Sequence, residues 1–266
     1  MIDYNGKTAM VTGGASGIGR ALAQALARRG ARILLVDRNE QGLVETARAI
    51  AGSETVVADL SNPEAAQKLV EAAYEKIGPI DLICSNAGIA RGGRATTVQE
   101  RLDLTVTQLF EVNLFASVRI AQAYAEKLTE TGGRGRLMIT GSEHSLSLPK
   151  RTRRNRMALY AATKHAVLII AEWMREEFPA HTPIDVHVLL PGMTYSAMIA
   201  RVLTNPADAP PEAGLIMPDR CAEIALQGMD LGLFYIPTHP HLANDMRVRL
   251  DGVAAAIEAL GLAKPG

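Results

Sequence analysis

Three glycines follow a short apolar run near the start of the chain, as Gly13, Gly17 and Gly19 in the segment 12–19. With this spacing, the first glycine permits a tight turn after a strand. The second lets the backbone approach a pyrophosphate, and the third lets the next helix pack closely on the sheet. Ser16 and Ile18 complete the turn, and the following helix would present its first N–H groups to the phosphates. The segment predicts a dinucleotide-binding turn, with a purely structural turn as the alternative.

An acidic residue, Asp37, lies eighteen residues after Gly19, at the end of the next apolar run. A carboxylate in this place can accept hydrogen bonds from both ribose hydroxyls of adenosine, and it repels the 2′-phosphate of NADP. The neighbouring Arg38 would have the opposite effect if it paired with that phosphate, but it could equally lie over the adenine or in solvent. We expect NAD as the cofactor, with NADP as the alternative.

The elements that must position these residues follow from a regular alternation of short apolar runs with longer amphipathic stretches. The short runs, which we expect to be strands, occupy residues 8–12, 32–36, 55–58, 80–84, 136–140, 184–190 and 233–236. The amphipathic stretches, which we expect to be helices, include residues 17–30, 40–51, 63–77, 98–129 and 157–178. This alternation indicates a parallel sheet covered on both faces, and right-handed crossovers make it doubly wound. We expect one Rossmann-like α/β domain over residues 1–266, with seven strands in a three-layer α/β/α arrangement.

The composition excludes several classes of protein. The 266 residues contain 28 Lys and Arg against 28 Asp and Glu, and this formal charge of zero disfavours a nucleic-acid binder or a polybasic membrane anchor. Apolar residues make up 48% of the chain, which is enough for a full core. Two cysteines are too few for a disulfide scaffold, and neither a secretory signal nor an apolar run of about 18 residues is visible. We expect a cytoplasmic protein in a reducing compartment.

Besides the glycine-rich turn with Thr12, five other short motifs occur in a characteristic order along the chain. They are Asp59-Leu60, Ser85-Asn86-Ala87-Gly88, Asn113, Tyr160 with Lys164, and Pro191-Gly192-Met193-Thr194. Together they resemble the short-chain dehydrogenase/reductase family over nearly the whole chain, although Ser85 stands where the family has a first Asn. The resemblance implies that the segments 59–60 and 86–88 bind the dinucleotide and that the segment 191–194 contacts the nicotinamide.

The resemblance places the reaction at Tyr160 and Lys164, which lie one helical turn apart. Hydride transfer from an alcohol needs a base for the hydroxyl proton. A free phenol has a pKa of about 10, so its phenolate needs about 3–4 kcal/mol of extra stabilisation to act near neutral pH. A lysine ammonium and the positive nicotinamide would favour the phenolate. We expect Tyr160 to be the general acid/base and Lys164 its electrostatic partner, which also holds the nicotinamide ribose as in the family.

Two polar residues complete the catalytic group that the resemblance implies. The family has a serine just past the fifth strand, and Ser142 matches it by position, although it lies eighteen residues before Tyr160. Ser147, thirteen residues before Tyr160, has the usual spacing but no strand directly before it, and Ser145 is a further competitor. Asn113 would continue a proton relay through water to Lys164, or it simply distorts its helix.

Two further segments bear on the substrate. The stretch 193–217 is long for a connector and contains three prolines, and we expect it to be a lid, with a disordered loop as the alternative. We expect the substrate site to be lined by Ser142, His144, Tyr160, Met193, Tyr195 and Met198. An apolar roof favours bulky aromatic, steroid-like or terpenoid alcohols over sugars. The segment 150–156 has five basic residues in seven, which either attract an acidic substrate group or form a solvated loop or subunit contact.

Partners and metals are the last expectations. The family commonly forms homodimers or homotetramers, and the run 232–236 with the tail 237–266 would suit such a contact or simply complete the monomer. His239 and His241 lack an acid or third ligand at helical spacing, so we expect no metal. The expected partner is a small alcohol or ketone, and a non-catalytic dinucleotide-binding protein is the alternative class.

Overall fold

A computed structural model describes residues 2–90, 104–149 and 157–262 of the chain. Within these ranges, seven strands form one parallel sheet in the order β3-β2-β1-β4-β5-β6-β7. The strands are β1 (Thr8–Thr12), β2 (Arg32–Asp37), β3 (Glu54–Val57), β4 (Leu82–Ser85), β5 (Gly135–Thr140), β6 (Ile184–Leu190) and β7 (Tyr235–Pro237). The prediction of a seven-stranded, doubly wound parallel sheet is confirmed.

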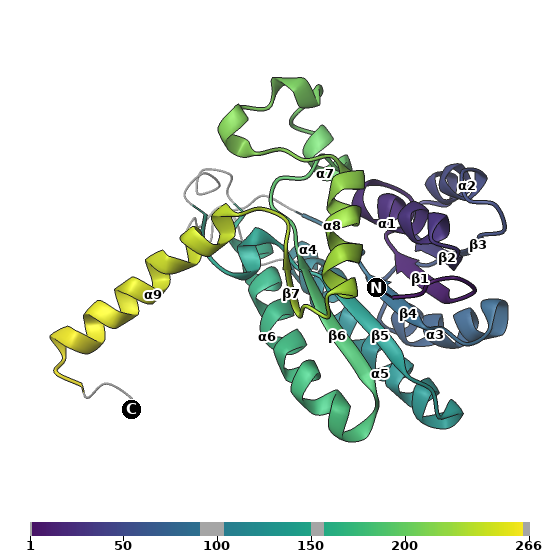
Figure 1. Cartoon of the computed structure of the whole chain (residues 1–266). Coiled ribbons are helices and arrows are strands. Elements are labelled where there is room, and N and C mark those ends of the chain that lie inside the picture. The colour runs from purple at the N-terminus through teal and green to yellow at the C-terminus, as the bar shows by residue number, and fades with distance from the viewer. Residues whose placement is uncertain (1, 91–103, 150–156, 263–266) are drawn as a thin grey trace.

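Helices cover both faces of this sheet (Figure 1), which explains why its central strands are almost continuously apolar. One apolar core lies beneath α1 (Gly17–Arg28), α2 (Glu40–Arg48) and α8 (Pro218–Asp230). The other lies beneath α3 (Pro63–Ile77), α5 (Ala116–Thr131) and α6 (Ala158–His181). The sheet order reverses between β1 and β4, and in doubly wound folds ligands bind beside such a point, at the carboxyl ends of the strands.

The helix expected over residues 98–129 is not one regular helix. Its described part consists of α4 (Leu104–Phe110), a π-helical turn η1 (Glu111–Phe115) and α5. Asn113 lies within the π-helical turn and is buried. Single π turns inside helices are frequent at functional sites, and this one directs attention to Asn113.

The segment 193–217 leaves the end of β6 and rises beyond the carboxyl edge of the sheet (Figure 1). It contains α7 (Ala197–Ala200) and two 3₁₀ turns, η4 (Pro206–Asp208) and η5 (Pro211–Ala213). Its two ends are joined, because Tyr195 N donates to Ile216 O at 2.9 Å and Ile216 N donates to Met193 O at 3.0 Å. The segment is therefore a loop whose two ends are hydrogen-bonded to each other, and it lies over the edge of the sheet where ligands bind in this class of fold.

The chain ends in α9 (His241–Ala259), which extends away from the sheet and its covering helices (Figure 1). Leu242 is its one buried residue. Arg249 on α9 donates to His165 Nε2 on α6 at 2.8 Å. Among the described residues, no helix combines the length and the apolar character needed to cross a bilayer.

Candidate active site

The glycine-rich turn joins β1 to α1 and leaves the start of this helix open. Ser16 is the N-cap, yet its side chain makes no capping hydrogen bond, and the first turn of α1 contains no acid. The positive φ angles of Gly13 (71°) and Gly17 (54°) belong to the left-handed region that glycine tolerates. The first N–H groups of α1, together with the positive end of the helix, fit a phosphate group.

Crowding explains two of these glycines. A Cβ on Gly13 would lie 2.9 Å from Asn86 Nδ2, and a Cβ on Gly19 would overlap the Gly13 carbonyl oxygen. Ile18, also in the predicted phosphate-binding turn, is half-buried against the core beneath α1. The turn therefore has no room for a side chain at either of these two positions.

Thr12 connects this turn to the segment after β4. Its Oγ1 accepts hydrogen bonds from the backbone N–H groups of Asn86 and Ala87, each at 3.0 Å. The Asn86 side chain donates to Thr12 O at 3.2 Å, and its Oδ1 accepts from Thr140 Oγ1 at 3.2 Å. These contacts hold the ends of β1, β4 and β5 together and position Gly88 beside the catalytic candidates described below.

Two carboxylates stand at the ends of β2 and β3. Asp37 Oδ2 accepts from Ala15 N at 3.2 Å, which brings this carboxylate to the glycine-rich turn. The pKa of Asp59 is lowered, chiefly by the backbone N–H of Ser61 and to a smaller extent by the positive charge of Arg38. Arg38 is exposed and Leu60 is buried. Arg38 therefore lies close enough to Asp59 to feel its charge.

Ser142 and Tyr160 meet although they come from different elements. Ser142 caps the 3₁₀ turn η2 (Glu143–Ser145) directly after β5, and Tyr160 is in the first turn of α6. Burial raises the pKa of Tyr160, a hydrogen bond with the Ser142 side chain lowers it, and the charge of Glu143 raises it further. The His144 ring lies edge-on to the Tyr160 ring, with centroids 5.9 Å apart.

Ser145 and Ser147, the two alternatives to Ser142 as the catalytic serine, have other positions in the structure. The hydroxyl of Ser145 accepts from Ser142 N at 3.1 Å and so supports the turn that carries Ser142. Ser147 is buried further along the same segment. Position after the strand, rather than sequence spacing, thus identifies Ser142 as the serine next to Tyr160.

Lys164 is buried beneath Tyr160. Its Nζ lies 5.9 Å from the centroid of the Tyr160 ring and donates to Thr140 O at 2.7 Å. Burial lowers the pKa of Lys164 to about 8. The sequence led us to expect a Tyr160 pKa below that of a free phenol. In this structure the pKa of Tyr160 is raised instead, because burial is the dominant effect.

Asn113 links three parts of the site. Its Oδ1 accepts from Ile89 N at 2.8 Å, and its Nδ2 donates to Ile89 O at 2.9 Å and to Thr163 Oγ1 at 3.0 Å. A Cβ on Gly88 would lie 3.4 Å from Asn113 Oδ1 and 3.6 Å from Lys164 Nζ, so both side chains reach the same backbone segment. Asn113 is thus held on the side of Lys164 that faces the end of β4.

The segment after β6 borders the same region. Pro191 O accepts from Glu143 N at 2.7 Å, and Gly192 N donates to Thr238 Oγ1 at 3.0 Å. Thr194 is buried, whereas the Tyr195 hydroxyl donates to Thr204 O at 2.9 Å within the segment 193–217. The structure therefore places segment 191–194 against the turn that carries Ser142, and it directs the Tyr195 hydroxyl into the expected lid.

Comparison with known proteins identifies the family. The sequence profile of the family described as short chain dehydrogenase matches residues 7–207. The chain belongs to the short-chain dehydrogenase/reductase family. It is 35% identical over 236 residues to 1-deoxy-11-beta-hydroxypentalenate dehydrogenase of Streptomyces avermitilis, covering 87% of this chain and 84% of that protein. It is 30% identical over 250 residues to L-xylulose reductase of Bos taurus, covering 93% and 96% of the two chains.

Solved structures of this short-chain dehydrogenase/reductase family have the same fold. A family member from Burkholderia phymatum in complex with NAD superposes with a TM-score of 0.80 at 25% identity, covering 100% of this chain and 99% of that chain. A short-chain dehydrogenase from Sphingobium yanoikuyae in complex with NADPH gives a TM-score of 0.73 at 27% identity, covering 96% and 94%. The chain is therefore an oxidoreductase of the class that acts on CH–OH groups and uses a nicotinamide dinucleotide.

Some residues that shape the site were not predicted. Thr163 accepts from Asn113 and donates to Tyr160 O at 2.7 Å, and it occupies the position just before Lys164. Thr238 and His239 support the segment after β6, with a Thr238 Oγ1 to His239 Nδ1 contact of 2.7 Å. The signal for Thr163 was its place inside the Tyr-Lys motif, whereas Thr238 and His239 carry no local pattern. The basic segment 150–156 lies outside the described residues.

The statement that His241 lacks an acid at helical spacing is wrong. Asp245 lies four residues after His241, and both belong to α9, so they share one face of this helix. With Glu143 they form a group whose candidate ligand atoms all lie within 4.8 Å of one another. The error arose because the start of a helix at His241 was not predicted.

Proposed function

We propose that this protein transfers a hydride between NAD and a secondary alcohol or ketone, with Tyr160 as the general acid/base. The observation that carries the proposal is the buried cluster of Ser142, Tyr160 and Lys164 at the carboxyl ends of the central strands. A buried phenol next to a hydroxyl and an amine is poised for proton transfer to a substrate oxygen.

The residues that would hold the dinucleotide are distributed around the carboxyl edge of the sheet. We assign the phosphates to the turn containing Gly13, Ser16, Gly17, Ile18 and Gly19, the adenosine to Asp37, Arg38, Asp59 and Leu60, and the nicotinamide end to Asn86, Ala87, Gly88, Lys164, Pro191, Gly192, Met193 and Thr194. When bound, the oxidised dinucleotide supplies the hydride acceptor and a positive charge that favours the phenolate.

The chain's own groups handle the proton. Ser142 would hold the substrate oxygen by a hydrogen bond, and Tyr160 would take the hydroxyl proton as the carbon loses its hydride. In the reverse direction Tyr160 donates that proton to the ketone oxygen, for which the neutral phenol of a buried tyrosine is already suited. Lys164 stabilises the phenolate through its positive charge, and Asn113 positions the chain next to Lys164 for a relay through water.

Asp37 supports NAD over NADP. Its carboxylate is held at the glycine-rich turn by Ala15 N, where a 2′-phosphate would meet a negative charge. Arg38 would favour NADP only if it paired with that phosphate, and its positive charge also helps to lower the pKa of Asp59. Titration of both cofactors tests this: NAD should bind at least about tenfold more tightly, and Asp37→Ala should remove most of that preference.

The substrate is proposed to be an apolar secondary alcohol that enters beneath the segment 193–217, between His144, Met193 and Met198. The name of the Streptomyces avermitilis relative also specifies a hydroxyl-bearing substrate. We propose that the protein acts in the cytoplasm as a homodimer or homotetramer and that residues 1–266 form one domain.

The deciding experiment measures turnover of NAD with a panel of secondary alcohols. Tyr160→Phe should lower kcat by about 10²–10⁴-fold and leave NAD affinity within about twofold, because the phenol contributes proton transfer rather than binding. Tyr235→Phe, which removes an exposed hydroxyl bonded to Glu172, is the matched control. Full activity of Tyr160→Phe would refute the assignment, and NAD binding without turnover on any alcohol or ketone would favour a non-catalytic protein.

A further inference from the structure

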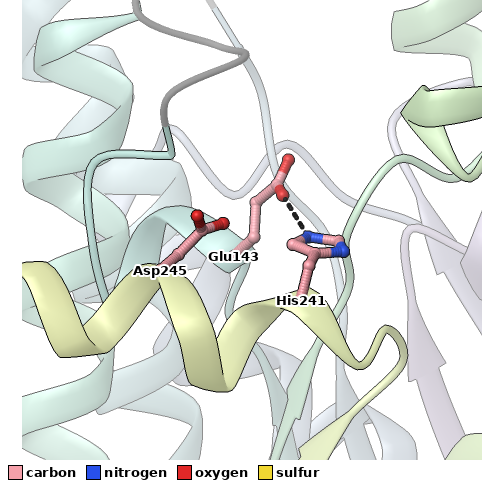
Figure 2. A group of neighbouring side chains, drawn as sticks. All are labelled: Glu143, His241 and Asp245. Carbon is pink, nitrogen blue, oxygen red and sulfur yellow. Dashed lines mark hydrogen bonds and ion pairs between the residues drawn. The ribbon is translucent and has the colours of Figure 1, made fainter.

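A group of metal-ligating side chains lies behind the proposed catalytic serine. Glu143 follows Ser142 in the turn η2, and His241 and Asp245 project from the first turns of α9 toward it (Figure 2). His241 Nε2 lies 3.0 Å from Glu143 Oε2. One ligand atom from each of the three residues lies within 4.8 Å of the others.

Two separate backbone elements, η2 and α9, hold these three groups. Glu143 N donates to Pro191 O at 2.7 Å, and the Glu143 side chain is only 8% exposed. His241 and Asp245 are separated by one turn of α9, so their side chains rise from the same face. The convergence therefore joins a turn after β5 to a helix that begins 98 residues later.

The neighbouring His239 is not part of this group. Its Nδ1 lies 2.7 Å from Thr238 Oγ1 and its Nε2 lies 2.7 Å from Gly214 O. Both ring nitrogens of His239 are thus engaged by the segments that surround β6 and β7. Of the two imidazoles around Pro240, the one directed at Glu143 belongs to His241.

Two carboxylates and one imidazole are a donor set for a divalent first-row metal ion. Zn²⁺ binds such ligands at about 2.0–2.2 Å, and two ligand atoms at this distance in a tetrahedral site lie about 3.4 Å apart. The 3.0 Å contact is close to this value, and the ligand atom of Asp245 lies within 4.8 Å of the other two. The two carboxylates are also opposite in charge to such an ion.

We propose that Glu143, His241 and Asp245 bind a divalent metal ion of the Zn²⁺ class, with water in the remaining coordination position. Such an ion fastens the first turns of α9 to the turn that carries Ser142. The competing arrangement is an ion pair between Glu143 and His241, in which Asp245 contributes nothing. The two arrangements differ in what happens when the Asp245 carboxylate is removed.

The test uses the full chain, freed of metal with a chelator and titrated with Zn²⁺ by calorimetry and with Co²⁺ by its visible absorption. We expect one ion per chain, and Asp245→Asn and His241→Ala should each weaken binding by about tenfold or more. Asp251→Asn, an exposed carboxylate on the same helix, is the matched control and should bind as the wild type does.

The site has a second readout in hydrogen exchange. Added Zn²⁺ should slow amide exchange in the first turns of α9 of the wild type and of Asp251→Asn, but not of Asp245→Asn. No stoichiometric binding by the wild type, or equal affinity of Asp245→Asn and Asp251→Asn, would overturn the proposal. Asp245→Asn keeps size and shape at a half-exposed position, so the test stands even if His241→Ala fails to fold. Binding is measured without dinucleotide or alcohol and is therefore decided separately from the proposed hydride transfer.

Discussion

Replacing Lys164 with methionine should change how the stability of this protein depends on pH. Burial lowers the pKa of Lys164 to about 8, against 10.5 for an ordinary lysine, which is the value expected in the unfolded chain. Between these two values the unfolded chain binds more protons than the folded chain, so wild-type stability rises with pH across this range. At pH 7 both states are protonated, and the folded state carries the full cost of burying the charge.

The size of this cost follows from the two pKa values. They differ by about 2.5, and each whole unit corresponds to about 1.4 kcal/mol, so the cost is about 3 kcal/mol at pH 7. About 2 kcal/mol of it disappears by pH 9.5, where the folded-state lysine has lost its proton. Methionine has a similar length and no charge, so the variant lacks this pH-dependent term, whatever it loses with the hydrogen bond to Thr140 O.

Urea unfolding at pH 7 and pH 9.5, at one protein concentration, measures the effect. Relative to Lys164→Met, the wild type should gain about 2 kcal/mol of unfolding free energy between the two pH values. Lys68→Met, at an exposed lysine paired with Glu64, is the control and should differ from the wild type by the same small amount at both pH values. A constant difference between wild type and Lys164→Met would refute the reasoning that Lys164 is buried with a depressed pKa.

Two substitutions and one labelling experiment test the site and the core further. Gly19→Ala should weaken NADH binding by about tenfold or more, measured by fluorescence titration, because its Cβ would overlap the Gly13 carbonyl oxygen. Thr12→Val should lower the unfolding free energy by about 2–4 kcal/mol in urea, because two backbone N–H groups lose their acceptor. Burial raises the pKa of both Cys84 and Cys221 to about 12, so neither thiol should react with a disulfide reagent at pH 8 until the protein is unfolded.

Each of the two substitutions has its own control. Gly252→Ala lies on α9 with no atom within 4 Å of the new Cβ, and it should leave NADH binding unchanged. Thr12→Ser keeps the hydroxyl and should retain most of the stability that Thr12→Val loses. Equal NADH affinity for the two glycine variants, equal stability of the two Thr12 variants, or rapid thiol labelling of the native protein would contradict the corresponding prediction.

The sheet was predictable because its strands are buried on both faces. The run 8–12 is β1 without a change of boundary, and the run 184–190 is β6. One boundary moved where burial is weaker, because the run 233–236 pairs only over Tyr235–Pro237, at the edge of the sheet. The run 80–84 also shifted, to Leu82–Ser85, although that strand is buried. Periodicity reports burial, so it fails where an edge strand is half exposed.

The site was only partly predictable. Ser142 could be assigned because a residue directly after a strand has a defined place at the sheet edge. The partner of Lys164 could not, because it is the carbonyl of Thr140, and backbone groups leave no pattern in side-chain types. The pKa of Tyr160 also depends on burial by segments distant in sequence. Asp245 was missed because its proximity to Glu143 depends on where α9 begins, which the sequence pattern did not show.

The π-helical turn η1 has a consequence for the packing of the whole segment 104–131. A residue added to a helix rotates everything beyond it by about 100°, and the π turn holds about one such residue. The helices on either side of the π turn therefore face different neighbours: α4 contacts α6, whereas α5 contacts α3. Removing one residue from this turn would make α4 and α5 one regular α-helix, and one of the two helix–helix contacts would be lost. The length of this segment is thus a structural constraint in its own right, separate from the identity of its side chains.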